Sequence, residues 1–166
     1  GIIKMLDVHY LSSNMKKTPF GQTAQWLWDN GYTFDYISDR MLKESGMGKD
    51  KVILIPTTVR MPLPTLKALA ERVKEGASVL FIDKLPTDVP GLFEYQQRRL
   101  ELRLLEPAVA KIFRITKMKD LQTVLAEWGI FPEPFKEVGI DFIRKTKGDT
   151  VIYFLTNFSG HDVDTW

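Results

Sequence analysis

The chain alternates between short apolar runs and longer segments in which apolar residues recur every three or four positions. Residues 52–56 and 79–82 are almost wholly apolar, which is typical of strands covered on both faces. Between these runs, Leu66, Leu69 and Val73 have the spacing of one helix face. Strands that alternate with helices in this way predict a parallel sheet joined by right-handed crossovers.

Helix start and stop signals complete the pattern. Thr18 suits an N-cap, Pro19 suits the first helical position, and Gly31 suits the helix end. We expect strands at residues 2–10, 32–37, 52–56, 78–82 and 111–115, and helices at 19–30, 39–44, 64–75, 93–105 and 118–128. The fold class that follows is α/β: a flavodoxin-like three-layer domain with a five-stranded parallel sheet in the order 2-1-3-4-5.

The pattern changes after residue 135. Residues 141–157 contain two strand-like segments around Lys147-Gly148-Asp149, which predicts an antiparallel hairpin. We therefore expect an α/β domain at residues 1–135 and a hairpin at residues 136–166 that begins a truncated β-sandwich domain. A two-stranded hairpin is marginal in water by itself. It should dock on the α/β domain, through Phe131 and Phe135, or pair with a second copy.

Composition and charge exclude several classes of function. The 44% of hydrophobic and 27% of charged residues are ordinary for a globular protein, and the net charge of +2 predicts no nucleic-acid partner. No apolar run approaches the roughly 20 residues that span a bilayer, so we expect no membrane contact. The absence of cysteine excludes disulfides, thiolate metal ligands and cysteine nucleophiles. His9 and His161 lie too far apart to indicate a metal pair.

Carboxylate pairs matter because a glycosidase needs two such groups. Asp35 and Asp39 lie four residues apart, and Glu44 follows. An aspartate at the start of a helix, as expected for Asp39, has an ordinary role as a cap. We therefore assign no catalytic residue to this chain. No Gly-x-Ser-x-Gly motif is present either.

The loop after the first expected strand offers an alternative function. Ser12, Ser13, Asn14 and Thr18 lie there, before the first helix, where a flavodoxin-type sheet binds phosphate through backbone amides and hydroxyls. The loop lacks glycine, which hinders close approach of the backbone to a phosphate. The alternative is a free-standing flavodoxin-like binding module for a phosphate or flavin ligand.

Six sequence blocks together resemble the region after the catalytic barrel in the large α-L-rhamnosidases of glycoside hydrolase family 106. These blocks are residues 31–38 (GYTFDYIS), 52–56, 61–69, 76–81, 86–92 and 142–157. The resemblance covers residues 21–160. The order of the blocks, with the hairpin at the end, is more specific than any block alone.

The resemblance implies a role without catalysis. In that family the α/β part is a glutamine-amidotransferase-like domain that braces the barrel or lines one wall of the sugar site, and a β-sandwich domain follows. The family removes terminal rhamnose with barrel carboxylates and a calcium ion, and none of these positions falls in the matched region. The resemblance thus implies an accessory fragment without a cofactor or metal of its own. Asp35 and Tyr36 are candidates for the rim of the sugar site.

The same resemblance implies the partners and the compartment. The partners are the catalytic barrel and the β-sandwich domain of a longer parent chain. The parent is expected to be periplasmic or secreted, and the question of enzymatic activity in this chain stays open at this point.

Overall fold

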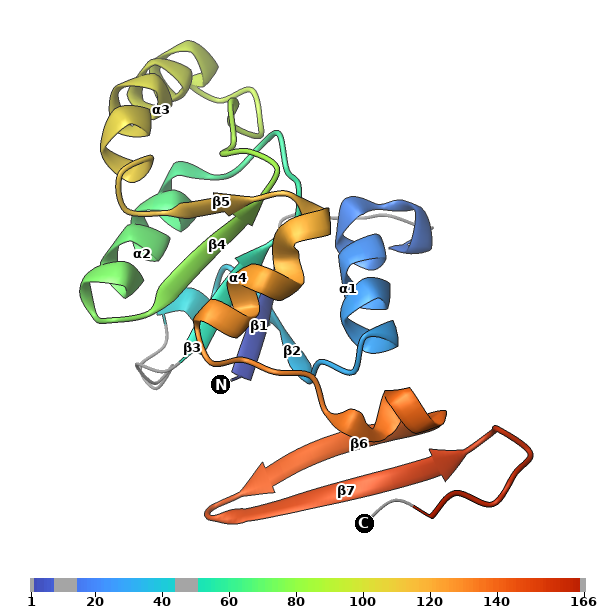
Figure 1. The fold of residues 1–166 in the computed structure, drawn as a ribbon. Helices are drawn as coiled ribbons and strands as arrows, with labels where there is room; N and C mark the ends of the chain where they lie inside the picture. The colour runs from blue at the N-terminus through green and yellow to red at the C-terminus, as the bar shows by residue number, and fades with distance from the viewer. Residues whose placement is uncertain (1, 8–14, 44–50, 165–166) are drawn as a thin grey trace.

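The computed structural model describes residues 2–7, 15–43 and 51–164. Its main part is a five-stranded parallel sheet in the order β2-β1-β3-β4-β5 (Figure 1). The strands are β1 (Ile2–Asp7), β2 (Phe34–Ser38), β3 (Lys51–Ile55), β4 (Ser78–Ile82) and β5 (Arg114–Thr116). The predicted fold class and strand order are confirmed, and residues 8–10 of the first predicted strand lie outside the described residues.

Four α-helices cover the two faces of the sheet. The helices are α1 (Pro19–Asp29), α2 (Leu63–Lys74), α3 (Tyr95–Val109) and α4 (Leu121–Glu127). Buried side chains of α1 and α4 pack together against one face, and those of α2 and α3 pack against the other. Short 3₁₀ turns lie at η1 (Met15–Lys17), η2 (Met41–Lys43), η3 (Met118–Asp120) and η4 (Pro134–Val138).

The apolar runs form the middle of the sheet, as predicted. Along β3, Val52 and Leu54 face α1 and α4, whereas Ile53 and Ile55 face α2 and α3. All four side chains are buried. Because successive strand residues point to opposite faces, a strand covered on both sides must be apolar at every position.

Several predicted element boundaries differ from the structure by two to four residues, and two of them lie on either side of the turn that follows Pro107. Helix α3 continues to Val109, although a proline inside a helix removes a hydrogen bond and usually ends it. Val109 is buried in the core, and burial holds this last turn in place. Strand β5 begins at Arg114 instead of residue 111, because the chain turns after the helix before it enters the sheet. At the end of this turn, Phe113 packs on Phe81 with ring centroids 5.2 Å apart.

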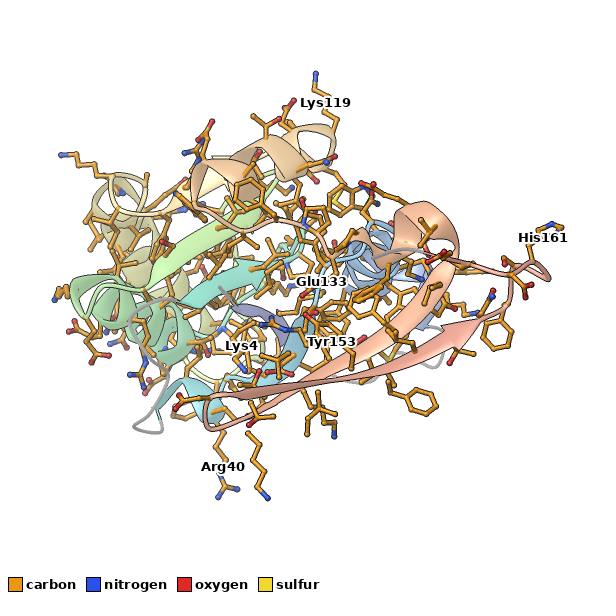
Figure 2. All side chains as sticks on the ribbon, turned by 60° about the horizontal axis from the view of Figure 1, so that its bottom comes forward. Lys4, Arg40, Lys119, Glu133, Tyr153 and His161 are labelled. Carbon is orange, nitrogen blue, oxygen red and sulfur yellow. The ribbon has the colours of Figure 1, made fainter. Side chains whose placement is uncertain are left out.

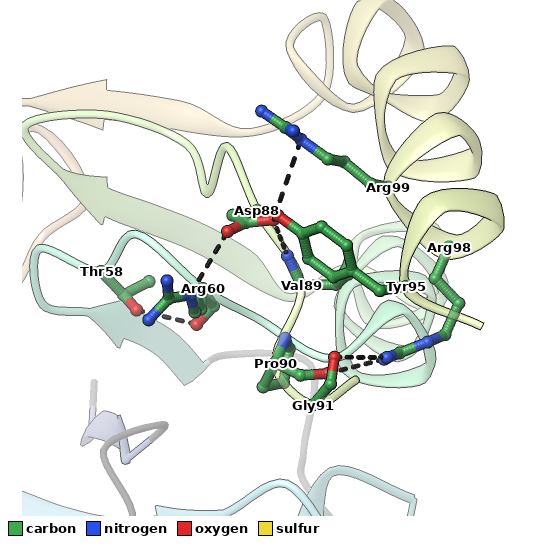
Figure 3. A network of polar contacts seen from close by, with 9 residues as sticks. All are labelled: Thr58, Arg60, Asp88, Val89, Pro90, Gly91, Tyr95, Arg98 and Arg99. Carbon is green, nitrogen blue, oxygen red and sulfur yellow. Dashed lines mark hydrogen bonds and ion pairs between the residues drawn. The ribbon is translucent and has the colours of Figure 1, made fainter. Parts of the chain in front are cut away.

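The loop between β4 and α3 is held by one carboxylate, Asp88 (Figure 3). The Tyr95 hydroxyl and the Val89 amide both donate to its Oδ1 atom at 2.9 Å. Arg60 Nε donates to Oδ2 at 3.3 Å, and Arg99 Nε lies 4.0 Å from Oδ1. These hydrogen bonds, with the one from Tyr95 first, lower the pKa of Asp88.

Arg98 fixes the same loop to the start of α3. Its guanidinium donates to three backbone carbonyl oxygens, those of Pro90, Gly91 and Phe93, at 2.7 to 2.8 Å. The hydrogen bonds of Asp88 and Arg98 together tie the beginning of α3 to the loop before it (Figure 3).

The C-terminal part is an antiparallel hairpin of β6 (Ile140–Lys147) and β7 (Thr150–Asn157), as predicted. Gly148 is the first residue of the two-residue turn and has a φ of 58°, a conformation that glycine adopts at no steric cost. Phe135 of η4 packs on Phe142 and Tyr153, with ring centroids 5.5 and 5.2 Å away. Phe131 does not share this role, since it is 68% exposed.

The hairpin also contacts the α/β unit. The Glu133 amide donates to the Gly31 carbonyl at 2.8 Å, and the Lys136 ammonium lies 4.6 Å above the Trp28 ring. Lys136 also forms an ion pair with Asp141 of β6, so one side chain links the hairpin to α1. The hairpin is therefore docked on the α/β unit. Its pairing with a second copy and the domain boundary at residue 135 stay predictions.

Candidate functional site

A cleft of 570 Å³ lies between the α/β unit and the hairpin. Residues 32–36 and Trp28 line one side, and residues 142–146 of β6 line the other. Strand β2 is the outermost strand of the parallel sheet, and β6 pairs with β7 alone within the described residues. Each wall therefore presents the edge of a strand, and consecutive residues along both strands contribute to the lining.

Aromatic rings form the floor of this cleft on the α/β side. Tyr36 is 54% exposed, yet its ring packs on Phe20 and Phe34 with centroid distances of 5.3 and 5.5 Å. Trp28 is 38% exposed and lies under the ammonium group of Lys136. Both side chains are thus partly exposed and held in place by neighbouring groups. A second hollow of 340 Å³ shares Trp28, Phe34 and Tyr36 with the cleft and extends it toward η1.

Two charged residues in the lining, Asp35 and Arg144, lie beside groups of opposite charge, whereas Lys145 is exposed to solvent. Asp35 forms an ion pair with Lys4 of β1, next to it across the sheet. On the other wall, Arg144 Nε lies 3.5 Å from Glu133 Oε1, and the Tyr153 hydroxyl donates to the same oxygen at 3.0 Å. Figure 2 shows Glu133 and Tyr153 between the hairpin and the α/β unit. Burial, and then the Glu133 carboxylate, raise the pKa of Tyr153.

Unpartnered polar atoms gather in the cleft lining. Four buried side-chain nitrogen or oxygen atoms of the described residues have no hydrogen-bond partner, and three of them belong to the lining: Tyr32 Oη, Thr33 Oγ1 and Arg144 Nε. Tyr32 is 3% exposed, and burial raises the pKa of its hydroxyl. Each such atom costs roughly 1–3 kcal/mol while it lacks a partner. The lining therefore carries a concentrated and unmet capacity for hydrogen bonds.

The candidates for the rim of a sugar site, Asp35 and Tyr36, both line this cleft. Asp39 does not belong to the lining, and Glu44 lies outside the described residues. The sequence alone did not indicate Trp28 or Arg144. These residues lie more than a hundred positions apart in sequence, and the docking of the hairpin brings them to one cleft.

The phosphate-loop candidates find no support in the described part of the chain. Ser12, Ser13 and Asn14 lie outside the described residues. The Thr18 hydroxyl accepts from the Gly21 amide at 3.1 Å and donates to the Met15 carbonyl at 2.7 Å, so it serves as the helix cap.

A hollow of 190 Å³ does lie at the carboxyl end of the sheet, where ligands of this fold bind. Its lining includes Thr57 and Asp83, and the Thr57 hydroxyl donates to the Asp83 carboxylate at 2.6 Å. Lys117 lies 3.5 Å from the same carboxylate. A carboxylate at this place disfavours a phosphate group.

Metal clusters and membrane spans are not found in the described residues. Within residues 2–7, 15–43 and 51–164, no three side chains of histidine, cysteine, aspartate or glutamate are arranged to hold a metal ion. Over the same residues, no helix has the length and apolar character that crossing a membrane requires.

The surface also carries large apolar side chains outside the cleft. On α3 and the loop before it, Leu92, Phe93, Leu100 and Leu104 are 91%, 78%, 57% and 73% exposed. The sequence pattern of this segment predicted a polar helix, because its charged residues outnumber the leucines. On the hairpin, Ile143, Ile152 and Phe154 are 50%, 54% and 67% exposed.

Comparison with known proteins gives distant similarity to solved structures. No family model matches the sequence, and no curated protein matches it. Among solved structures, the chain resembles part of an apo exo-carrageenase of glycoside hydrolase family 42 from Bacteroides ovatus, with 8% sequence identity and a TM-score of 0.45. The match covers 89% of this chain and 19% of that one. A similarity this distant does not transfer an activity.

Proposed function

We propose that this chain is a non-catalytic accessory part of a glycoside hydrolase of the α-L-rhamnosidase type, in which it braces the catalytic barrel. Asp35 and Tyr36 lie at the rim of the parent's sugar site, and the parent is periplasmic or secreted. The observation that carries the proposal is a pair of exposed apolar surfaces, one on α3 and one on the hairpin. These two elements lie at opposite ends of the molecule (Figure 1).

The α3 surface consists of Leu92, Phe93, Leu100 and Leu104. The four-residue spacing of Leu100 and Leu104 places these two on one face of α3, and Leu92 and Phe93 lie in the loop just before the helix. A single exposed leucine is ordinary, but a row of apolar side chains marks an interaction surface. The hydrogen bonds of Asp88 and Arg98 hold this row in place, as a rigid docking surface requires.

The hairpin surface consists of Ile143, Ile152 and Phe154. Ile143 lies directly opposite Phe154 in the antiparallel register, so their side chains share the face that points away from Phe135. A two-stranded hairpin with one bare apolar face gains stability when further strands or another domain cover that face. This is the arrangement expected of the first two strands of a β-sandwich.

The blocks that resemble family 106 occupy positions consistent with this role. The block at residues 31–38 contains β2, and its residues 32–36 line the cleft, while the block at residues 142–157 forms most of the hairpin. In the family that these blocks resemble, the catalytic carboxylates lie in the barrel and not in these blocks. The proposal therefore places the chemistry of the parent in another domain.

Two results test the proposal. The purified chain should release no p-nitrophenol from p-nitrophenyl α-L-rhamnoside or from a panel of other aryl glycosides. Its reading frame should encode a barrel with paired carboxylates before residue 1. Turnover that survives repurification and disappears in Asp35→Asn would make this chain the enzyme, and a reading frame without a barrel would remove the accessory role.

A further inference from the structure

We propose that the cleft between β2 and β6 binds a neutral oligosaccharide, and that this chain supplies the whole binding site. The inference goes beyond the bracing role, because it needs no contribution from a barrel. The 570 Å³ of the cleft falls within the roughly 300–1,000 Å³ that is typical of small-molecule sites.

The first argument is the pair of accessible aromatic faces. A pyranose ring has a face of C–H groups that packs on a flat aromatic ring, and Trp and Tyr supply such area with little loss of side-chain freedom. Trp28 and Tyr36 are partly exposed, and their orientations are fixed by Lys136 and by Phe20. The rings are therefore organised before a ligand arrives, which lowers the entropy cost of binding.

The second argument is the set of unpartnered polar atoms. A sugar hydroxyl both donates and accepts, so it can pair with the Tyr32 hydroxyl or the Thr33 hydroxyl. These atoms are covered in the ligand-free cleft, so the proposal requires side chains of the wall to rotate when a ligand binds. The hydrogen bonds gained would remove the free-energy cost of leaving these buried hydroxyls without partners in the ligand-free protein. A purely apolar ligand would leave that cost in place.

The third argument concerns charge and decides between neutral and acidic ligands. Asp35 is paired with Lys4, and Arg144 lies beside Glu133, so these two charges are already compensated, and the remaining lining cation, Lys145, is exposed to solvent. A phosphate or a uronate would have to compete with Glu133 for Arg144 and would lie near Asp35. A neutral saccharide requires no such exchange.

Binding can be measured on the full 166-residue chain. Saturation-transfer NMR and calorimetry would use cellotriose, xylotriose and maltotriose as neutral probes, and trigalacturonate as the acidic probe. At least one neutral trisaccharide should bind, and trigalacturonate should bind more weakly. Failure of all three neutral probes at about 10 mM, a concentration that would reveal even millimolar affinity, or a preference for trigalacturonate, would overturn the proposal.

Variants place the binding in the cleft. Trp28→Ala and Tyr36→Ala should each weaken binding by about tenfold or more. Thr33→Val should weaken it by roughly three- to tenfold, the value of one hydrogen bond. Leu104→Ala, on the distant α3 surface, is the matched control and should bind as the wild type does.

Thr33→Val also separates a binding role from a structural one. An unpartnered hydroxyl contributes nothing to folding, so its removal should leave the urea midpoint of the ligand-free chain unchanged or raised. A lowered midpoint, or unchanged affinity in Thr33→Val together with Trp28→Ala, would contradict the proposal. None of these results depends on whether the chain braces a barrel, which the reading frame tests separately.

Discussion

At the scale of single residues, a few side chains decide which loops are rigid. Asp88 accepts from Tyr95, Val89 and Arg60, and through them it fixes the loop that leads into α3. Within the cleft the opposite holds, since Tyr32 and Thr33 have polar atoms without partners. The hydrogen bonds of Asp88 hold a loop in place. The unpartnered hydroxyls of Tyr32 and Thr33 instead offer hydrogen bonds to the proposed ligand.

Asp88 makes the stability of the chain depend on acid. Its pKa is lowered in the folded state, so its contribution is fully present above the unfolded value of about 3.9 and is lost as the pH falls through the folded value. Asp88→Asn should lower the urea midpoint at about pH 7 and flatten its fall below about pH 4. Glu106→Gln, on an exposed part of α3, removes the same charge without touching this network and is the control. If the urea midpoint of Asp88→Asn fell below about pH 4 as steeply as that of the wild type, this account would be refuted.

At the scale of elements, local sequence pattern predicted most of the fold. Apolar runs indicated β3 and β4, and Thr18, Pro19 and Gly31 marked the limits of α1, because burial and capping act within a few residues. The end of α3 was wrong, since the burial of Val109 outweighs the local effect of Pro107. Local signals do not report such long-range packing.

The candidate site was likewise predicted only where local sequence carried the signal. Asp35 and Tyr36 were predicted from one sequence block, but the resemblance and not the pattern of polarity pointed to them. Trp28 and Arg144 were missed, because the docking of β6 on the α/β unit depends on the Glu133–Gly31 hydrogen bond and the Lys136–Trp28 contact. No periodicity along the chain encodes these contacts.

Gly31 is the element-scale position where the docking can be broken. Its φ is 77°, and a Cβ atom there would lie 2.7 Å from the Glu133 carbonyl oxygen. Gly129 has a similar φ of 71°, and a Cβ atom there would have nothing within 4 Å, so it serves as a matched control. Gly129→Ala should cost about 1–2 kcal/mol from backbone strain alone.

Gly31→Ala should cost more than Gly129→Ala, and it should also loosen the hairpin. Urea unfolding compares the two variants, and limited trypsin digestion reports cleavage near residues 144–147. Equal stability losses with equal cleavage would show that the close approach of residues 31 and 133 does not hold the hairpin.

At the scale of the whole molecule, the chain has the surface expected of a domain that lies between two other domains. Helices cover both faces of its parallel sheet, and α3 and the hairpin lie at opposite ends of the molecule (Figure 1). Both ends carry exposed apolar side chains, Leu100 and Leu104 on α3 and Ile152 and Phe154 on the hairpin. Burial of such side chains is worth about 25 cal/mol per Å² of apolar area removed from water. Neighbouring domains that cover both ends would therefore stabilise the chain and hold it in place.

The measurement that tests this central claim most directly is hydroxyl-radical footprinting of the α3 surface and the hairpin surface. The 166-residue chain would be compared with the longer polypeptide that its reading frame encodes. Phe93, Leu100, Leu104 and Phe154 should be oxidised in the isolated chain and protected in the longer one, while Tyr36 stays accessible unless a saccharide is added. Equal oxidation of the α3 and hairpin side chains in both proteins would contradict the claim that adjoining domains cover these surfaces.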